Sequence, residues 1–170
     1  AGIEDYLSPR GIVLDRDLSK VHPVDANSPE EIKEYIYHSW YKYTEGDKAG
    51  LHPYNGETNL EYTGPKPPYK HLDVEDKYSW IKTPRWKGQP MEVGPLARLI
   101  VAYAAGKEPQ KTAVDNVLKQ LNLPAEALFS TLGRTAARGI ETQLVAGWSL
   151  EFFDQLMKNL ENGDSRMANP

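Results

Sequence analysis

Cysteine is absent from this sequence of 170 residues. Disulfide bonds, zinc sites built from thiolates and iron–sulfur clusters ligated by this chain are therefore excluded. The sequence also lacks the glycine-rich phosphate loop of nucleotide-binding proteins and the Gly-x-Ser-x-Gly turn of serine hydrolases. No motif for phosphate binding or for nucleophilic catalysis is therefore present.

Clustered positive charge and long apolar runs are also missing. The chain has 20 Lys and Arg against 24 Asp and Glu, a formal net charge of −4, and no basic block. This balance argues against nucleic acid as a partner. The longest apolar run, 99–105, is far shorter than the ~20 residues that a membrane-spanning helix needs. The sequence therefore predicts no membrane span in this chain.

The length suits one domain of ordinary size. We expect an α+β fold that is mainly α, with two regions that are both parts of one larger domain. Residues 1–76 are predicted to be rich in strands and loops, with one short helix and an extended aromatic arm; residues 77–170 are predicted to be helical. The chain starts at Ala1 without an initiator methionine and stops at Pro170 just after a predicted helix, so we expect an internal piece of a longer polypeptide.

Short apolar runs and turn residues dominate the first region. Runs at 11–14 and 18–24 are typical of strands, the second at a sheet edge because of its proline. Ser28, Pro29 and Glu31 form the signature of a capped helix start. Three apolar residues that would share one face of this helix follow: Ile32, Tyr35 and Ile36.

Residues 44–76 are interrupted by eight glycines and prolines and have few apolar residues. Such a long irregular segment usually marks a functional loop, a linker or a surface arm. Its tyrosines Tyr54, Tyr62 and Tyr69 suit a hydrated contact surface. We therefore expect an arm that lies on another protein or domain, with a poorly ordered surface loop as the alternative.

The second region has helical periodicity after a short strand predicted at 78–82. Gly94 and Pro95 begin a helix that is apolar almost all round and therefore buried, over 95–105. A second helix is expected over 109–121, and a long one over 124–161. Three glycines, Gly133, Gly139 and Gly147, predict either a kink in this long helix or the close approach of a neighbouring helix.

Few side chains are candidates for chemistry. The four histidines, His22, His38, His52 and His71, lack metal-ligand spacing along a helix and are interpreted as solvent-facing or capping residues. On the long helix Arg134 and Arg138 share a face, and Glu141 is placed to pair with Arg138. The alternative is that one of these arginines holds a carboxylate from elsewhere in a longer polypeptide.

Two further features lie just before the buried helix. Glu92 is expected to act as a helix-start acid, with a metal or catalytic role as the alternative. Trp80 and Trp86 flank Pro84 and Arg85, which predicts stacking of Arg85 on a tryptophan. Aromatic residues of the first region (Trp40, Tyr41, Tyr43 and Tyr54) also suit sugar binding, but this pattern is not specific.

Five stretches together resemble the large subunit of nickel–iron hydrogenases, of the periplasmic or membrane-bound uptake type. They are HSWYKY at 38–43, HPYNG at 52–56, KYSWIKTPRW at 77–86, MEVGPLAR at 91–98 and LFSTLGRTAAR at 128–138. Their order and spacing are similar to the central part of that subunit, and the similarity extends over nearly the whole chain.

The resemblance implies a part in the reversible oxidation of H2 at a nickel–iron centre with CO and cyanide ligands. In the family, that centre is held by two Cys-x-x-Cys pairs, an Arg-Gly-x-Glu segment supplies a proton-transfer glutamate, and a later arginine overhangs the metals. None of these motifs occurs here. The resemblance therefore implies no catalytic, cofactor-binding or directly metal-ligating residue in this chain, and inactivity of the chain alone.

What the resemblance does imply is a scaffold, in which the long helices form part of the helix bundle of the large subunit. The nickel–iron centre and magnesium would belong to the complete large subunit, and the iron–sulfur clusters to a small subunit. Partners would be the remainder of the large subunit and that small subunit, on the periplasmic side of a membrane. Glu92 matches a family position near the magnesium or iron site, in contact through water.

Two alternatives to this hypothesis are a self-standing protein-interaction module and a small carbohydrate-binding or hydrolytic protein. Cooperative folding of the isolated chain would favour the first. The second requires paired carboxylates in a cleft, and the sequence identifies no such pair.

Overall fold

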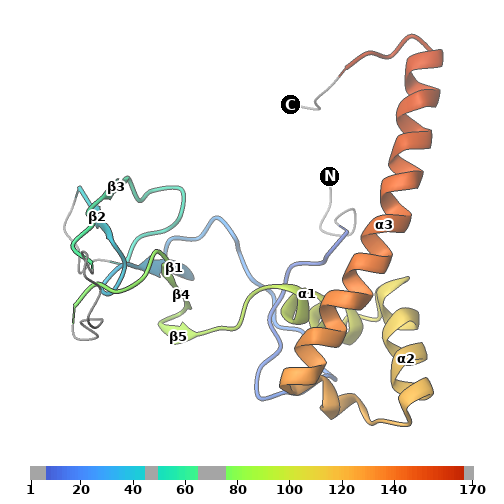
Figure 1. The fold of residues 1–170 in the computed structure, drawn as a ribbon, viewed down its shortest axis with the longest axis horizontal. Coiled ribbons are helices and arrows are strands. Elements are labelled where there is room, and N and C mark those ends of the chain that lie inside the picture. Colours follow the sequence, from blue (N-terminus) through green and yellow to red (C-terminus); the bar gives the residue numbers. More distant parts are fainter. Residues whose placement is uncertain (1–6, 45–49, 65–75, 167–170) are drawn as a thin grey trace. The chain divides into compact units, whose positions relative to one another are not determined.

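The computed structural model describes residues 7–44, 50–64 and 76–166, and within these ranges it contains three α-helices and two small antiparallel sheets (Figure 1). The predicted α+β class is confirmed. The chain divides into two compact units, one of residues 24–92 and one that combines residues 1–23 with 93–170. That both belong to one larger domain stays a prediction.

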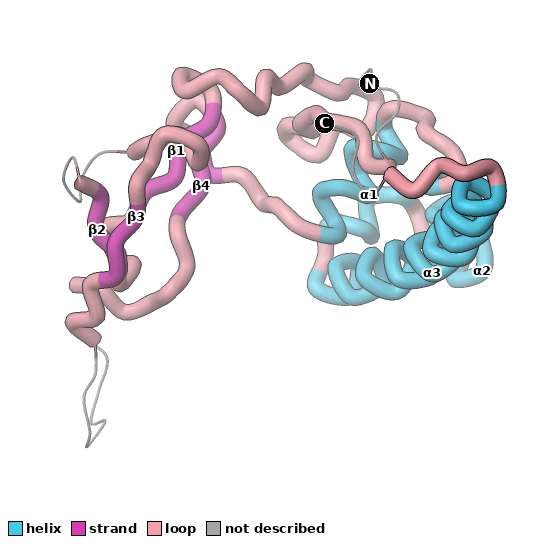
Figure 2. The backbone as a smooth tube through the Cα atoms, turned by 90° about the horizontal axis from the view of Figure 1, so that it is seen from above, coloured by secondary structure: helices cyan, strands magenta, loops and turns pink. Residues whose placement is uncertain are grey.

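In the unit of residues 24–92, the described residues form five short strands, of which Figure 2 labels β1 to β4. One sheet has the order β1-β4-β5, with bounds Ile32–Tyr35, Thr83–Trp86 and Gln89–Pro90; the other pairs β2 (Tyr41–Tyr43) with β3 (Thr58–Leu60). Strands β4 and β5 are joined by Lys87 and Gly88, both at positive φ (48° and 79°). A two-residue turn of this kind matches the right-handed twist of a hairpin.

The helix predicted after Ser28 is wrong, because the chain turns there and continues as β1. Half of the capping pattern is present, since the Glu31 N–H donates to Ser28 Oγ at 3.3 Å. The Glu31 carboxylate, however, accepts from the backbone N–H of Asp25 at 3.1 Å instead of returning to Ser28. Residues 32–35 then pair antiparallel with residues 83–86. Pairing with a distant strand therefore overrides the local helix signal.

The strands predicted elsewhere are also displaced or reduced. The run 78–82 contributes only a single bridge, between Ser79 and Ser39, and the strand begins at Thr83. The runs 11–14 and 18–24 meet in one antiparallel bridge, between Ile12 and His22. These segments run beside one another without forming a sheet.

In the unit that contains residues 93–170, α1 and α2 begin and end close to where the sequence predicts. Helix α1 spans Pro95–Ala104, with Pro95 in its first turn and Gly94 before it at φ 117°, a conformation that favours glycine. Helix α2 spans Gln110–Leu121 and ends at Asn122, which adopts the left-handed conformation (φ 52°). Glycine and asparagine are the usual residues at such ends because they tolerate positive φ.

The long helix is shorter than predicted at its start. Residues Ala125–Phe129 form a 3₁₀ turn, and α3 spans Thr131–Glu161 as one continuous helix of 31 residues. Ser130 sets the start, because its Oγ accepts a hydrogen bond from the Gly133 N–H at 3.0 Å.

The glycines of α3 do not interrupt the helix. A Cβ atom at Gly133 would collide with the backbone of Leu128, so the preceding 3₁₀ turn, and not another helix, requires glycine there. Within the described part of the chain, no other segment lies within 4 Å of a Cβ atom built at Gly139 or Gly147. The close helix contact predicted at these two positions is therefore not made by the described residues.

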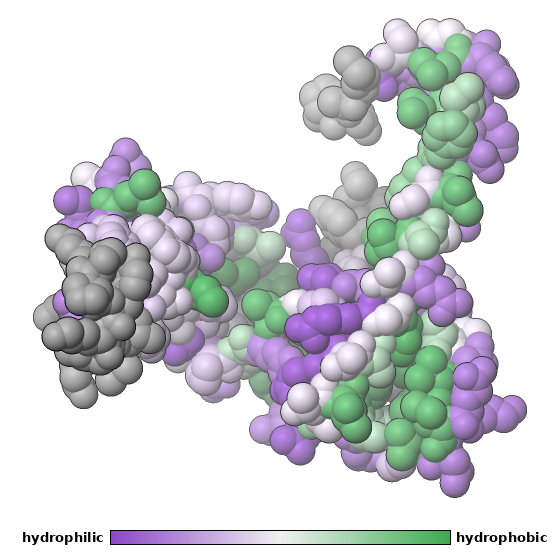
Figure 3. Space-filling model, in the orientation of Figure 1, coloured by the Kyte–Doolittle hydropathy of each residue, from purple (hydrophilic) through white to green (hydrophobic). Residues whose placement is uncertain are grey.

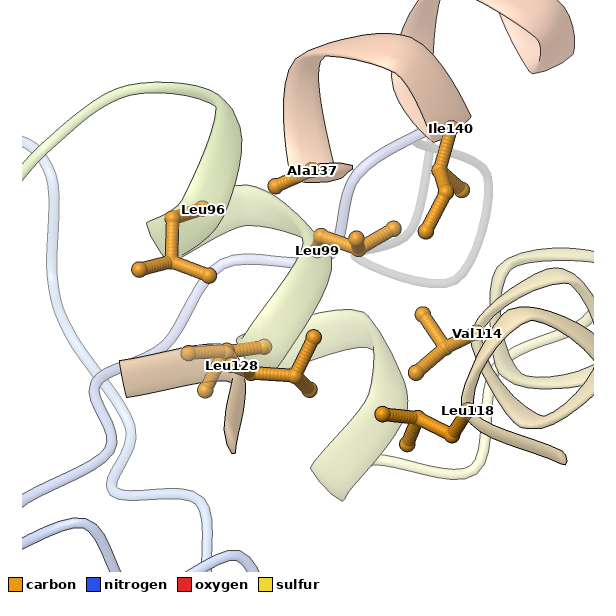
Figure 4. Close-up of a cluster of buried hydrophobic side chains, with 8 residues drawn as sticks. Leu96, Leu99, Val114, Leu118, Leu128, Ala137 and Ile140 are labelled. Carbon is orange, nitrogen blue, oxygen red and sulfur yellow. The ribbon is translucent and has the colours of Figure 1, made fainter. Parts of the chain in front are cut away.

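A single apolar cluster holds the helices together (Figure 4). It contains Leu96, Leu99, Ile100, Val114, Leu118, Leu128, Ala137 and Ile140, each at most 9% exposed. The residues come from α1, α2, the 3₁₀ turn and the first half of α3. The prediction that the helix beginning at Pro95 is buried is confirmed.

Removing a side chain from this cluster should destabilise the helical unit. Leu99→Ala is expected to lower the free energy of unfolding by about 2–5 kcal/mol, because it leaves a cavity at a position only 3% exposed. The measurement is urea denaturation followed by circular dichroism at 222 nm. The matched control is Leu132→Ala on α3, which is 80% exposed and should change stability by no more than about 0.5 kcal/mol. Equal losses from both variants would contradict this packing.

Candidate functional site

The described residues offer no site for a metal ion built from side chains. No group of three or more histidines, aspartates or glutamates in ranges 7–44, 50–64 and 76–166 is placed to hold one. Glu92 is exposed and lies three positions before Pro95, the first residue of α1. Among the helices of these ranges, none is long and apolar enough to cross a membrane.

The side chains of His38 and His52 are held by backbone groups, whereas His22 makes its contact through its main chain. His38 Nδ1 donates to the Asp76 carbonyl oxygen at 2.8 Å, and His22 takes part in the bridge with Ile12. His52 is buried, and both of its ring nitrogens are engaged: Nε2 donates to the Ala26 carbonyl oxygen at 2.8 Å, and Nδ1 accepts from the Tyr54 N–H at 3.2 Å. His52 therefore ties two loops of its unit together. His71 lies outside the described residues.

An ion pair joins α1 to α3 in the helical unit. Arg98 Nε and Nη2 donate to the two carboxylate oxygens of Glu141 at 2.5 and 2.7 Å. This bidentate geometry joins residues 43 positions apart and fixes α1 against α3. The hydrogen bonds from Arg98 hold the pKa of Glu141 below its ordinary value of 4.5, against the opposing effect of burial.

The predicted ion pair between Glu141 and Arg138 is therefore wrong, because Glu141 pairs with Arg98. Arg138 donates instead to the Arg134 carbonyl oxygen at 3.0 Å, one turn back along α3. Sequence reasoning overlooked Arg98, although a useful signal existed: it is the only charged residue in an otherwise apolar helix. A lone charge in such a helix needs a partner from another element.

An aromatic cluster surrounds a buried lysine in the other unit. Trp80 packs edge-on against Trp40 (ring centroids 4.9 Å apart) and stacks on Tyr62 (5.6 Å, 11° between planes). The Trp40 Nε1–H donates to the Lys77 carbonyl oxygen at 3.0 Å.

Lys77 itself is only 8% exposed, and its ammonium group donates to Glu61 Oε2 at 2.9 Å and to the Tyr41 carbonyl oxygen. The hydrogen bond from Lys77 holds the pKa of the Glu61 carboxyl below its ordinary value. These contacts join segments 38–43 and 77–81, two of the stretches singled out in the sequence, into one packed core. Their role in this unit is structural.

The predicted stacking of Arg85 on a tryptophan is wrong. The cation over Trp86 is Lys87, whose Nζ lies 4.9 Å from the ring centroid. Arg85 donates to the Pro84 carbonyl oxygen at 2.8 Å. Of the predicted arm, Tyr54 is 80% exposed, Tyr62 belongs to the aromatic cluster, and Tyr69 lies outside the described residues.

In the second half of α3, apolar side chains are left uncovered by the residues that the structure describes. Large apolar side chains there are between 41% and 71% exposed: Val145, Leu150, Phe152, Phe153, Leu156, Met157 and Leu160. They gather on the part of α3 that extends beyond α1 and α2 (Figures 1 and 3). An exposed apolar patch of this size marks an interaction surface.

The pKa of Glu141 yields a prediction for acid stability. Since its folded-state pKa is lowered, the ion pair stabilises the folded state above about pH 4.5, and this contribution is lost as the pH falls through the folded-state value. Glu141→Gln should therefore be less stable than the natural chain at pH 7, and the difference should shrink on acidification. Urea denaturation at a series of pH values measures it.

The control for this measurement is Glu151→Gln, an exposed acid ten positions further along α3. It should alter stability little at any pH. A difference for Glu141→Gln that is constant with pH would contradict a contribution from the ionised pair.

Comparison with known proteins assigns a family to this arrangement of elements. The family model for nickel-dependent hydrogenases matches residues 1–170. The chain is 51% identical over 168 residues to the uptake hydrogenase large subunit of Bradyrhizobium diazoefficiens, a match that covers 95% of this chain and 28% of that protein. It is 41% identical over 172 residues to the hydrogenase-1 large chain of Escherichia coli, covering 98% of this chain and 29% of the relative.

Solved structures agree with these relatives. The [NiFeSe]-hydrogenase of Desulfomicrobium baculatum matches with a TM-score of 0.56 and 30% identity, over 89% of this chain and 28% of that chain. The chain thus spans less than a third of the length of the proteins it matches. Because the family model covers every residue and the relatives share up to 51% identity, the chain belongs to the nickel-dependent hydrogenase family.

Proposed function

We propose that this chain is a structural segment of a nickel–iron hydrogenase large subunit, the enzyme that reversibly oxidises H2 to protons and electrons. One observation carries the proposal: the family match extends over all 170 residues, and those residues include no cysteine. The relatives are named as uptake hydrogenase large subunits, and they are more than three times as long as the matched segment.

The residues of this chain do not fit the nickel–iron centre as ligands. Nickel and iron in such a centre require soft thiolate donors, and the sequence supplies none. Catalytic, cofactor-binding and directly metal-ligating residues are accordingly assigned to the remainder of the large subunit. Glu92, exposed just before α1, is proposed to contact the magnesium or iron site through water.

The contribution of this segment is scaffolding. The cluster shared by α1, α2 and α3 gives the large subunit a rigid helical block, and the Arg98–Glu141 pair fixes α1 against α3. The partners are the remainder of the large subunit and the small subunit that carries the iron–sulfur clusters. The location proposed is the periplasmic side of the membrane, which rests on the likeness to uptake hydrogenases.

Exchanging the segment into a relative tests this proposal. We expect the hydrogenase-1 large chain of Escherichia coli, with its matching region replaced by this chain, to assemble and to oxidise H2 with a dye as electron acceptor. The same large chain with the region deleted should be inactive, because the helical block would be missing. A chimera that takes up nickel and pairs with its small subunit but fails to react would contradict a purely structural role.

The isolated chain provides the complementary measurement. Elemental analysis of the 170 residues incubated with nickel should find no stoichiometric metal, because no thiolate is available. The control is the complete large subunit of the relative. One nickel ion bound per isolated chain would overturn the proposal.

A further inference from the structure

Helix α3 changes its apolar side midway along its length. In the first half, the side that faces the core carries Gly133, Ala137, Ile140 and Leu144, at the spacing of three and four residues that defines one face of a helix. The same face continues through Trp148 and then becomes polar, with Glu151, Gln155 and Lys158. The core of the helical unit therefore ends near Trp148.

Beyond that point the apolar residues lie on the other side. At about 100° per residue, the seven exposed apolar residues from Val145 to Leu160 fill an arc about 160° wide, centred nearly opposite the face toward α1 and α2. No charged residue falls within this arc, because Glu151, Asp154 and Lys158 lie on the other side. Neither α1 nor α2 can cover this face.

We infer that the face of α3 formed by Val145, Leu150, Phe152, Phe153, Leu156, Met157 and Leu160, the distal face, is covered by the remainder of the large-subunit polypeptide. This inference rests on the proposed function. It goes further by placing the contact on the side of α3 that is opposite the core shared with α1 and α2. The first half of α3 then belongs to that core, and the second half packs in a different one.

The chemistry of the distal face favours a permanent partner. Permanent interfaces resemble a protein core, whereas transient interfaces contain more polar groups. A surface helix typically turns an apolar stripe at least about 100° wide toward a core, and the arc of about 160° on the distal face is wide enough for such a contact. Two phenylalanines and three leucines exposed together leave a larger apolar surface than a soluble protein normally presents to water.

The length of the relatives identifies where such elements come from. The match to the large subunit of Bradyrhizobium diazoefficiens covers 95% of this chain but only 28% of that subunit. That subunit therefore extends far beyond the match. More than twice as much polypeptide as the segment itself is therefore available in the same chain. A contact within one polypeptide needs no second molecule and loses less entropy than association.

Two charge substitutions, two positions apart and on opposite sides of α3, test whether the distal face is buried. In the chimeric hydrogenase, Phe153→Glu should lower the yield of assembled large subunit by about tenfold or more, because it places an unpaired carboxylate in an apolar contact. Gln155→Glu adds the same charge on the polar face and should change the yield by less than about twofold. Equal yields from the two variants would overturn the inference.

A cross-linking experiment identifies the covering partner. Phe153 of the chimeric large chain is replaced by the photo-reactive residue benzoyl-phenylalanine. On irradiation, we expect a cross-link to another part of the same chain. Peptide mass spectrometry identifies the cross-linked segment, and the mass of the product should show that no second chain has been added. Cross-links only to the small subunit, only to a second large subunit, or only products of reaction with solvent would each overturn the inference.

These experiments distinguish failure of the proposed function from failure of the inference about the distal face. An unsubstituted chimera that assembles without oxidising H2 counts against the proposed function. The cross-link reports the packing of α3 whether or not the enzyme turns over, so its result decides the inference independently.

Discussion

Helix α1 is apolar apart from Arg98, and the need to remove its apolar side chains from water is the constraint that organises the helical unit. Helix α2, the 3₁₀ turn and the first half of α3 supply the covering surfaces. The one charged residue of α1, Arg98, remains partly exposed to solvent, and its guanidinium pairs with Glu141 of α3 in bidentate geometry. Burial thus brings the elements together, and the ion pair sets their relative position.

The separation of scaffold from chemistry follows from the composition of the chain. A nickel–iron centre depends on thiolates, and a segment without cysteine leaves that role to other parts of the polypeptide. What this segment has instead are two kinds of packed core. One is aliphatic and helical; the other is aromatic, with the hydrogen-bonded Lys77 enclosed between segments far apart in the sequence. The polar side chains within them are engaged in holding the fold.

Sequence patterns predicted the helices well and the strands poorly. Pro95, Asn122 and the periodic apolar residues marked α1 and α2 because helix signals are local, within a few residues of each end. For β1 the local signal indicated a helix, and pairing with β4, some fifty residues away, decided otherwise. The same limitation explains Glu141: its neighbour Arg138 was visible in the sequence, whereas Arg98 becomes its partner only through folding.

The sequence by itself determined that the chain has no thiolate ligands, where α1 and α2 begin and end to within a few residues, and its likeness to the hydrogenase family. These properties depend on residue identity and on short-range spacing, which a linear sequence contains in full. Only the tertiary structure decided that residues 32–35 form a strand, that Arg98 pairs with Glu141, and that the core of the helical unit ends midway along α3. Each of these depends on segments far apart in the chain, whose meeting is set by the free energy of packing the whole unit and not by any local preference.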